Sequence, residues 1–206
     1  MSKYMKILKE LNKDSLPEAG GKGANLGILI NAGLPVPPGF VVTTSAYDVH
    51  LEASGLKERI TKRLEKIKGQ DINEISEASK DISSWIEEAQ MPIEIQKELN
   101  IAFDSLYKKM GVGEKMSVSV QSSATAEDLP TASFAGQHET YLGIYGKENV
   151  IKHVKKCWAS LWSSQAINYR ISMNFEHLKV DLAVVVQAMI DSEAAGVMFT
   201  ANPVNG

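Results

Sequence analysis

The sequence predicts an α+β protein in which helices alternate with short strands that pair in an antiparallel way. Residues 56–110 and 148–171 repeat apolar residues at the three- and four-residue spacing of amphipathic helices. The near-continuous apolar run 182–190 is typical of a strand buried on both faces, and a short turn leads to a second expected strand at 195–200. Such a closely spaced strand pair favours α+β over a doubly wound parallel fold.

Composition narrows the class of protein. The 206 residues suffice for one large domain or two small lobes, and the net charge of −3 without a long basic run argues against a nucleic-acid partner. The single cysteine, Cys157, excludes an internal disulfide and lies in an apolar helical pattern, as a small buried hydrophobe would. No apolar run approaches membrane-spanning length and the N-terminus lacks an apolar leader core, so we expect a cytoplasmic protein.

The first half of the chain begins with a glycine-rich turn. Gly-Gly-Lys-Gly at 20–23 opens an expected helix over 24–31, and the Pro-rich segment 35–39 leads into a strand at 40–43. Residues 56–110 then form charge-laced helices, to which we assign no function. The chain stops on a turn at 202–206, directly after the last expected strand, which suggests a fragment of a longer protein.

The second half carries the most informative segment. A strand that starts at 117 enters a small, hydroxyl-rich loop at 122–137, and a further strand follows at 139–142. One long helix over 148–171 comes next, whose tryptophans we interpret as core. The hydroxyls of the loop belong to Ser122, Ser123, Thr125, Thr131 and Ser133. Small residues with free backbone N–H groups are how many proteins hold phosphate, although an ordinary surface loop has a similar composition.

Other candidate residues are ambiguous when taken singly. Lys22 at a helix start would attract an anion, but the spacing is not that of a Walker A loop, and a plain turn with a surface lysine fits equally well. Gln187 interrupts the apolar run of the last long strand, and Met189 lies near its end. The end of this strand could offer backbone N–H and C=O groups to a purine edge, with Met189 as an apolar contact, or it could simply be part of the core. The four histidines, His50, His138, His153 and His177, show neither metal-ligand spacing nor a nucleophile context.

Seven motifs follow one another along the chain: GGKGANLG (20–27), PVPPGF (35–40), SSATAEDLP (122–130), ASFAGQ (132–137), CWASLW (157–162), AINYR (166–170) and GVMFTANP (196–203). In this order they resemble one family, that of phosphoenolpyruvate synthase (pyruvate, water dikinase) and pyruvate, phosphate dikinase. The resemblance covers nearly the whole chain apart from residues 56–110, which would be a helical insertion. It implies that residues 1–206 are an incomplete N-terminal nucleotide-binding domain of ATP-grasp type, with two lobes and the C-terminal part missing.

The resemblance also implies a function and a site. Such a domain binds Mg-ATP and passes a phosphoryl group to a histidine on a separate domain, from which a barrel domain transfers it to pyruvate. No histidine of this chain would be the phosphorylated one, and the metal ligands would lie beyond residue 206. By position, Lys22 would contact the ATP phosphates, with Thr140 nearby. The mobile loop above them would comprise Ser133, Phe134, Ala135 and Gly136, and adenine would lie against Gln187, Met189 and Ile190.

One position departs from the family pattern. The family motif reads Val-Arg-Ser-Ser where this chain has Gln121 before Ser122 and Ser123. That arginine grips the migrating phosphoryl group, and a neutral amide cannot replace a fixed positive charge. Losing such a clamp costs on the order of a hundredfold or more in rate. We therefore expect the isolated chain to be inactive and to bind nucleotide weakly.

Two alternatives to a dikinase fragment remain open at this point. A degenerate Gln121 together with a missing catalytic half fits a stand-alone nucleotide-binding or regulatory module, a pseudoenzyme. The same domain type also occurs in rifamycin-phosphorylating antibiotic phosphotransferases, where only the acceptor differs.

Overall fold

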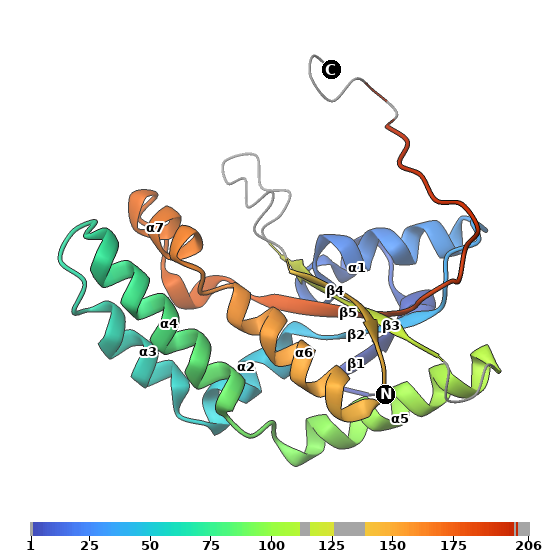
Figure 1. Ribbon diagram of the computed structural model, residues 1–206, viewed down its shortest axis with the longest axis horizontal. Coiled ribbons are helices and arrows are strands. Elements are labelled where there is room, and N and C mark those ends of the chain that lie inside the picture. Colours follow the sequence, from blue (N-terminus) through green and yellow to red (C-terminus); the bar gives the residue numbers. More distant parts are fainter. Residues whose placement is uncertain (1, 112–115, 126–138, 200, 202–206) are drawn as a thin grey trace.

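A five-stranded, fully antiparallel sheet forms the centre of the molecule (Figure 1). The computed structural model describes residues 2–111, 116–125, 139–199 and 201. The strand order is β1-β2-β5-β3-β4. The strands are β1 Met5–Ile7, β2 Gly39–Val42, β3 Val118–Ala124, β4 Thr140–Ile144 and β5 Leu182–Ala188. With helices packed on this sheet, the expected α+β class is confirmed.

The strand β5 is the last of the described strands along the chain but lies in the middle of the sheet, between β2 and β3. Its partners run antiparallel to it on both sides, with Val186 opposite both Phe40 and Val120. Six of its seven residues are buried. This confirms the expectation of a strand covered on both faces, since a run of branched apolar residues gains most where neither face meets water.

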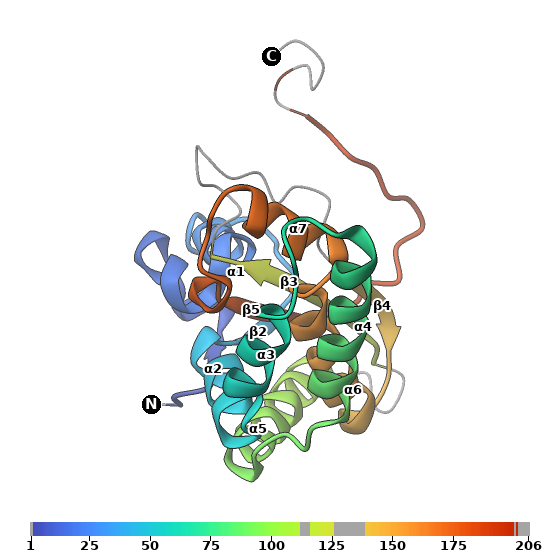
Figure 2. The ribbon, with the colours of Figure 1, turned by 90° about the vertical axis from the view of Figure 1, so that its left-hand side faces the viewer.

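Helices cover the two faces unequally (Figures 1 and 2). One face carries α1 (Leu16–Asn31), preceded by the short 3₁₀ turns η1 (Leu8–Glu10) and η2 (Lys13–Ser15). The helices of the other side are α2 Thr44–Ala53, α3 Leu56–Leu64, α4 Ile72–Glu88, α5 Ile93–Met110, α6 Lys147–Ser160 and α7 Ser164–Ser172, with the turn η4 at His177–Lys179. The expected helices of 56–110 are thus α3, α4 and α5.

Two hydrophobic clusters result from this arrangement. The larger one fills the space between the sheet and the many-helix side, and includes the buried Trp158 and Trp162. The smaller one lies under α1 and comprises Leu8, Leu11, Ala19, Val41, Ala183 and Val185. Because the small cluster is only six residues, the α1 face of the sheet is covered over part of its area. The tryptophans are core residues, as the sequence predicted.

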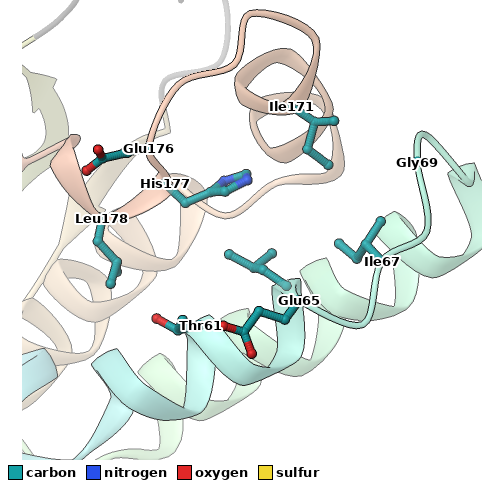
Figure 3. A pocket seen from close by; sticks show the side chains of 9 residues that line it. Thr61, Glu65, Ile67, Gly69, Ile171, Glu176, His177 and Leu178 are labelled. Carbon is teal, nitrogen blue, oxygen red and sulfur yellow. The ribbon is translucent and has the colours of Figure 1, made fainter.

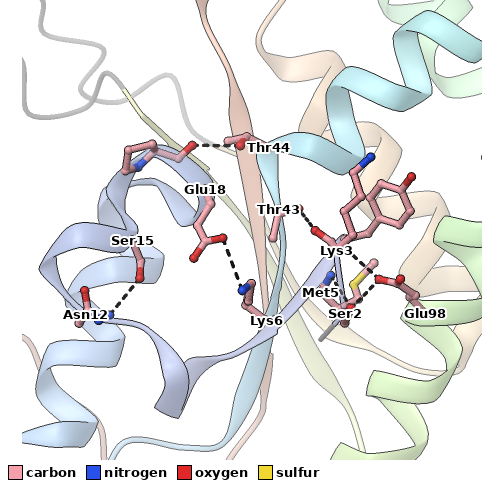
Figure 4. A network of polar contacts seen from close by, with 12 residues as sticks. Ser2, Lys3, Met5, Lys6, Asn12, Ser15, Glu18, Thr43, Thr44 and Glu98 are labelled. Carbon is pink, nitrogen blue, oxygen red and sulfur yellow. Dashed lines mark hydrogen bonds and ion pairs between the residues drawn. The ribbon is translucent and has the colours of Figure 1, made fainter.

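Polar contacts fix the start of α1 and the edge strand β1 (Figure 4). Thr44 Oγ1 donates to Pro17 O at 3.0 Å, and Lys6 Nζ lies 3.7 Å from a carboxylate oxygen of Glu18. On the other side of β1, Glu98 accepts a hydrogen bond from the backbone N–H of Tyr4 at 2.8 Å. The first turn of α1 is therefore tied to β1 and α2, which defines where the rest of the helix lies on the sheet.

Two expectations about secondary structure were wrong. The single helix expected over 148–171 is two helices, because the chain turns at Leu161–Ser163 and Ser163 caps α7 by accepting from Ala166 N at 3.2 Å. The strand expected at 195–200 is absent in the described residues up to 199. Val197 and Met198 are 83% and 90% exposed there, so this apolar segment has no strand beside it to pair with.

Candidate functional site

The polar residues that the sequence singled out gather on the α1 face of the sheet. Gln121 lies opposite Thr140 on one neighbouring strand and opposite Val185 on the other. Val185 belongs to the small cluster under α1, and side chains directly opposite in an antiparallel pair share a face. Gln187 follows Val185 by two residues and so points the same way. Gln121 and Gln187 are half-buried and Thr140 is exposed, so this part of the face is accessible to a ligand.

The helix α1 contains a break at Gly20. Its φ of +67° and ψ of 174° are not helical, and they separate a first turn, Leu16–Ala19, from the remainder of the helix. A Cβ built at Gly20 would lie 2.1 Å from Ser123 O, so only a glycine allows the two backbones to approach this closely. The glycine-rich motif is therefore where α1 meets β3, and not simply a turn.

Lys22 lies just after this break and is half-buried. Its Nζ donates to Ser122 O, the backbone carbonyl of β3, at 3.1 Å. An ammonium group has three N–H donors, and among the described residues Ser122 O accepts from one of them, so two are left for a ligand there. The structure thus brings Lys22 against the same strand that carries Gln121.

Ser122 and Ser123 have a different role from the one expected. The strand β3 continues to Ala124, so both serines are strand residues and both are fully buried. Ser122 Oγ donates to Glu139 O at 3.3 Å, and Ser123 Oγ donates to Ala19 O at 2.8 Å while accepting from Gly23 N at 3.1 Å. Their hydroxyls hold neighbouring segments together and are not free for phosphate.

A short chain of hydrogen bonds links Gln121 to Gln187. Gln121 Nε2 donates to Ser119 Oγ at 2.9 Å, and Ser119 Oγ donates to Gln187 O at 3.5 Å. Gln187 Nε2 in turn donates to Pro37 O at 2.9 Å. Ser119 was not among the predicted site residues. The one sequence signal for it is that it precedes Gln121 by two residues on a strand, so that both side chains lie on the same face of the sheet.

The remaining predicted site residues lie at or beyond the ends of the strands. Met189 follows β5 and donates its backbone N–H to Ser117 O at 3.0 Å, and Ile190 is 52% exposed. Ser133, Phe134, Ala135 and Gly136 fall outside the described residues. The structure therefore brings together Lys22, Gln121, Thr140 and Gln187, with Met189 and Ile190 just past the end of β5.

The AINYR motif belongs to the opposite side of the molecule. Arg170 is fully buried, its Nε donates to His177 Nδ1 at 3.1 Å, and its guanidinium lies 4.9 Å from the ring centre of Trp162. Burial lowers the pKa of Arg170 to about 10, and burial together with the nearby Arg170 charge lowers the pKa of His177 to about 4. Trp162 Nε1 donates to Tyr47 Oη at 2.8 Å. This motif joins α6, α7 and α2 in the core.

Two of the other histidines, His50 and His153, also lie away from the α1 face, and His138 falls outside the described residues. His50 is fully buried against Trp158, with ring centres 4.9 Å apart, and burial lowers its pKa to about 4. His153 packs against Tyr141 on the many-helix side, with ring centres 4.8 Å apart and the ring planes tilted by 58°. Burial likewise raises the pKa of the Cys157 thiol to about 12, so this cysteine is an inert core residue, as expected.

A cavity of about 460 Å³ lies between α3 and the α7–η4 segment (Figure 3). Leu64, Ile67, Ile171 and Leu178 give it an apolar wall, and His177 points into it. None of the predicted site residues that the structure describes lines this cavity, so it is separate from the polar face beside α1.

No helix of the described segments combines the length and apolar character needed to cross a membrane. Within the same residues, no three His, Cys, Asp or Glu side chains are grouped so that they could hold a metal ion.

The chain is similar to one group of known proteins, both by family model and by direct sequence comparison. The family model "Pyruvate phosphate dikinase, AMP/ATP-binding domain" matches residues 16–206. The chain is 47% identical to the "Probable phosphoenolpyruvate synthase" of Staphylothermus marinus, covering 99% of this chain and 25% of that protein. It is 48% identical to the probable phosphoenolpyruvate synthase of Methanocaldococcus jannaschii, over 98% of this chain and 17% of that protein. It is 43% identical to the phosphoenolpyruvate synthase of Pyrococcus furiosus, over 98% of this chain and 28% of that protein. The chain thus spans between about a sixth and just over a quarter of the length of these relatives.

Proposed function

This chain belongs to the family of pyruvate phosphate dikinase AMP/ATP-binding domains, and from this premise we propose that the polar face beside α1 is its nucleotide site. In this proposal Lys22 contacts the phosphates, with Gln121 and Thr140 beside them, and the end of β5 receives adenine. Ser133 to Gly136 would close over the phosphates. The observation that carries the proposal is the Lys22 ammonium, held on β3 by Ser122 O, one residue from Gln121, with two N–H donors that the described residues do not use.

The spacing of the face suits an extended nucleotide. Strands rise about 3.3 Å per residue, so the three steps along β3 from Ser119 to Ser122 span about 10 Å. Ser119 contacts Gln187 at the adenine end, and Ser122 contacts Lys22 at the phosphate end. That separation is comparable with the distance from a purine base to the outer phosphates of a nucleoside triphosphate.

We further propose that the whole protein is a phosphoenolpyruvate synthase, in which ATP phosphorylates an enzyme histidine and the phosphoryl group then passes to pyruvate. Catalysis of phosphoryl transfer is mainly positioning and charge stabilisation. Lys22 supplies positive charge to the phosphates, and the domains that carry the histidine and bind pyruvate are the expected partners. Such a metabolic enzyme would act in the cytoplasm.

Magnesium is expected with ATP. Among the described residues no three His, Cys, Asp or Glu side chains are grouped to hold a metal ion, and we derive no step through the metal.

The neutral Gln121 favours a second candidate function. One of its two Nε2 N–H donors is used by Ser119, and the side chain offers the site a neutral amide instead of a positive charge. A module that binds nucleotide without transferring a phosphoryl group fits this arrangement. Phosphohistidine formation in the full-length protein separates the two functions, because the binding module would show none.

The direct test is nucleotide binding to the 206-residue chain, measured by isothermal titration with ATP. Lys22→Ala should weaken ATP binding about tenfold or more, since a charge-assisted hydrogen bond is worth about 1.5–3 kcal/mol. Lys109→Ala is the matched control, because Lys109 is an exposed lysine on α5, on the other side of the sheet. Equal affinities of the two variants for ATP would refute the assignment of Lys22.

A further inference from the structure

The break in α1 is bridged by a side chain from another element. In a continuous α-helix the N–H of residue 23 would donate to the C=O of residue 19. Here the Ser123 hydroxyl stands between these two groups, accepting from Gly23 N at 3.1 Å and donating to Ala19 O at 2.8 Å. A serine hydroxyl has one donor and two acceptor sites, so one oxygen replaces the interrupted helical bond.

This bridge encloses the residue that the proposed function needs. Lys22 lies between the two bridged residues, directly before Gly23 and two residues after the break at Gly20. Its backbone is therefore fixed to β3 through Ser123, while its Nζ is fixed to β3 through Ser122 O at 3.1 Å. The helix cannot shift along the strand without breaking both contacts.

The bridge is also well protected. Ser123 is fully buried, and Gly20 and Gly23 are buried too. Water cannot replace the hydroxyl without opening the contact between α1 and β3, so its removal leaves Ala19 O and Gly23 N without partners.

We propose that Ser123 is a positioning residue for nucleotide binding: its hydroxyl holds the broken helix so that the Lys22 ammonium faces the phosphates. This inference rests on the proposed function. It predicts that Ser123 affects the phosphate part of the ligand and acts only through Lys22.

The test compares ATP with adenosine in ligand-detected NMR titrations, which reach millimolar dissociation constants. Ser123→Ala should weaken ATP binding about tenfold, the worth of one charge-assisted hydrogen bond, and change adenosine binding by less than about twofold. In a Lys22→Met background, Ser123→Ala should cause no further loss of ATP affinity, because the lysine it positions is gone.

Thr43→Val is the matched control. Thr43 lies between β2 and α2 and is equally buried, and its hydroxyl donates to Lys3 O at 3.2 Å, away from the α1–β3 contact. It should leave the ratio of ATP to adenosine affinity unchanged. Circular dichroism establishes that each variant is folded, and Ser123→Cys, with its weaker donor and acceptor, replaces Ser123→Ala if the alanine variant does not fold.

The outcomes separate the two proposals. If the chain does not bind ATP, or Lys22→Met does not weaken it, the proposed nucleotide site fails and this inference fails with it. If Lys22→Met weakens ATP but Ser123→Ala does not, only the role of Ser123 is overturned. Equal losses for ATP and adenosine, or a further loss in the Lys22→Met background, would show that Ser123 acts through general stability and would also overturn it.

Discussion

Replacing Gly20 by alanine should be among the most destabilising single substitutions in α1. The φ of +67° with ψ of 174° is a conformation that side chains other than glycine rarely adopt, and it costs on the order of 1–3 kcal/mol. The new Cβ would lie 2.1 Å from Ser123 O and 2.5 Å from Ser123 C, so the helix must move away from β3. Overpacking of this kind costs about 1–3 kcal/mol.

The movement would also strain the Ser123 bridge. Its two hydrogen bonds, to Ala19 O and from Gly23 N, contribute roughly 0.5–1.5 kcal/mol each. With partial relaxation we expect a loss of about 3–6 kcal/mol in the free energy of unfolding. That is a large share of the roughly 5–15 kcal/mol that stabilises a typical domain.

Two other glycines separate the contributions. Gly33 has a φ of +84° but no atom within 4 Å of a built Cβ, so Gly33→Ala tests backbone conformation alone and should cost about 1 kcal/mol. Gly27 has no positive φ, but its Cβ would lie 2.5 Å from Leu11 O, so Gly27→Ala tests crowding alone. Urea unfolding followed by tryptophan fluorescence gives all three values. A Gly20→Ala loss no larger than that of Gly33→Ala would refute the close approach of α1 and β3.

Three further predictions concern charge, pH and capping. Gln121→Arg should raise ATP affinity about tenfold in isothermal titration without changing adenosine binding, because it adds a charge-assisted donor beside Lys22; an unchanged affinity would contradict the placement of Gln121 at the phosphates. The pKa of His50, lowered to about 4 by burial, lies below its ordinary value of 6.5, so protonation favours the unfolded chain. The contribution of His50 to stability should be complete above about pH 6.5 and fall by about 2 kcal/mol by pH 5, in addition to that of His177, whose pKa burial also lowers to about 4. In urea unfolding, His50→Gln should therefore reduce the pH dependence of stability by about one bound proton and leave the part due to His177; an unaltered pH dependence would show that His50 does not contribute. Ser163→Ala removes the N-cap of α7 and should lower the free energy of unfolding by about 1 kcal/mol in the same assay. An unchanged free energy of unfolding would mean that core packing alone fixes where α7 begins.

The expected and observed structures differ where contacts between residues distant in the sequence determine the secondary structure. Local periodicity located the helices of 56–110 and the buried strand β5, because apolar spacing reports which side of an element is covered. The same periodicity concealed the turn at Leu161–Ser163, since the apolar residues on both sides of it face one core. It also suggested a strand at 195–200, but a strand needs a neighbour to satisfy its backbone, and the described residues provide none.

The candidate site shows the same division. The motifs indicated Lys22, Gln121, Thr140 and Gln187 as separate positions along the chain, and the family resemblance related them to one another. Sequence reasoning assigned Ser122 and Ser123 to a loop as phosphate-binding hydroxyls, whereas in the structure they are buried in β3. Ser119 lacked any signal of its own.

The sequence by itself determined the α+β class, the order of most elements and the family, because these follow from local patterns and from motifs that are contiguous in the chain. Only the tertiary structure decided that the helix carrying Lys22 is broken at Gly20 and bridged by Ser123. These residues lie about a hundred positions apart, and the bridge exists because a glycine lets the two backbones meet. A hydrogen bond between elements so distant in the chain is a property of how they pack, which no local pattern records.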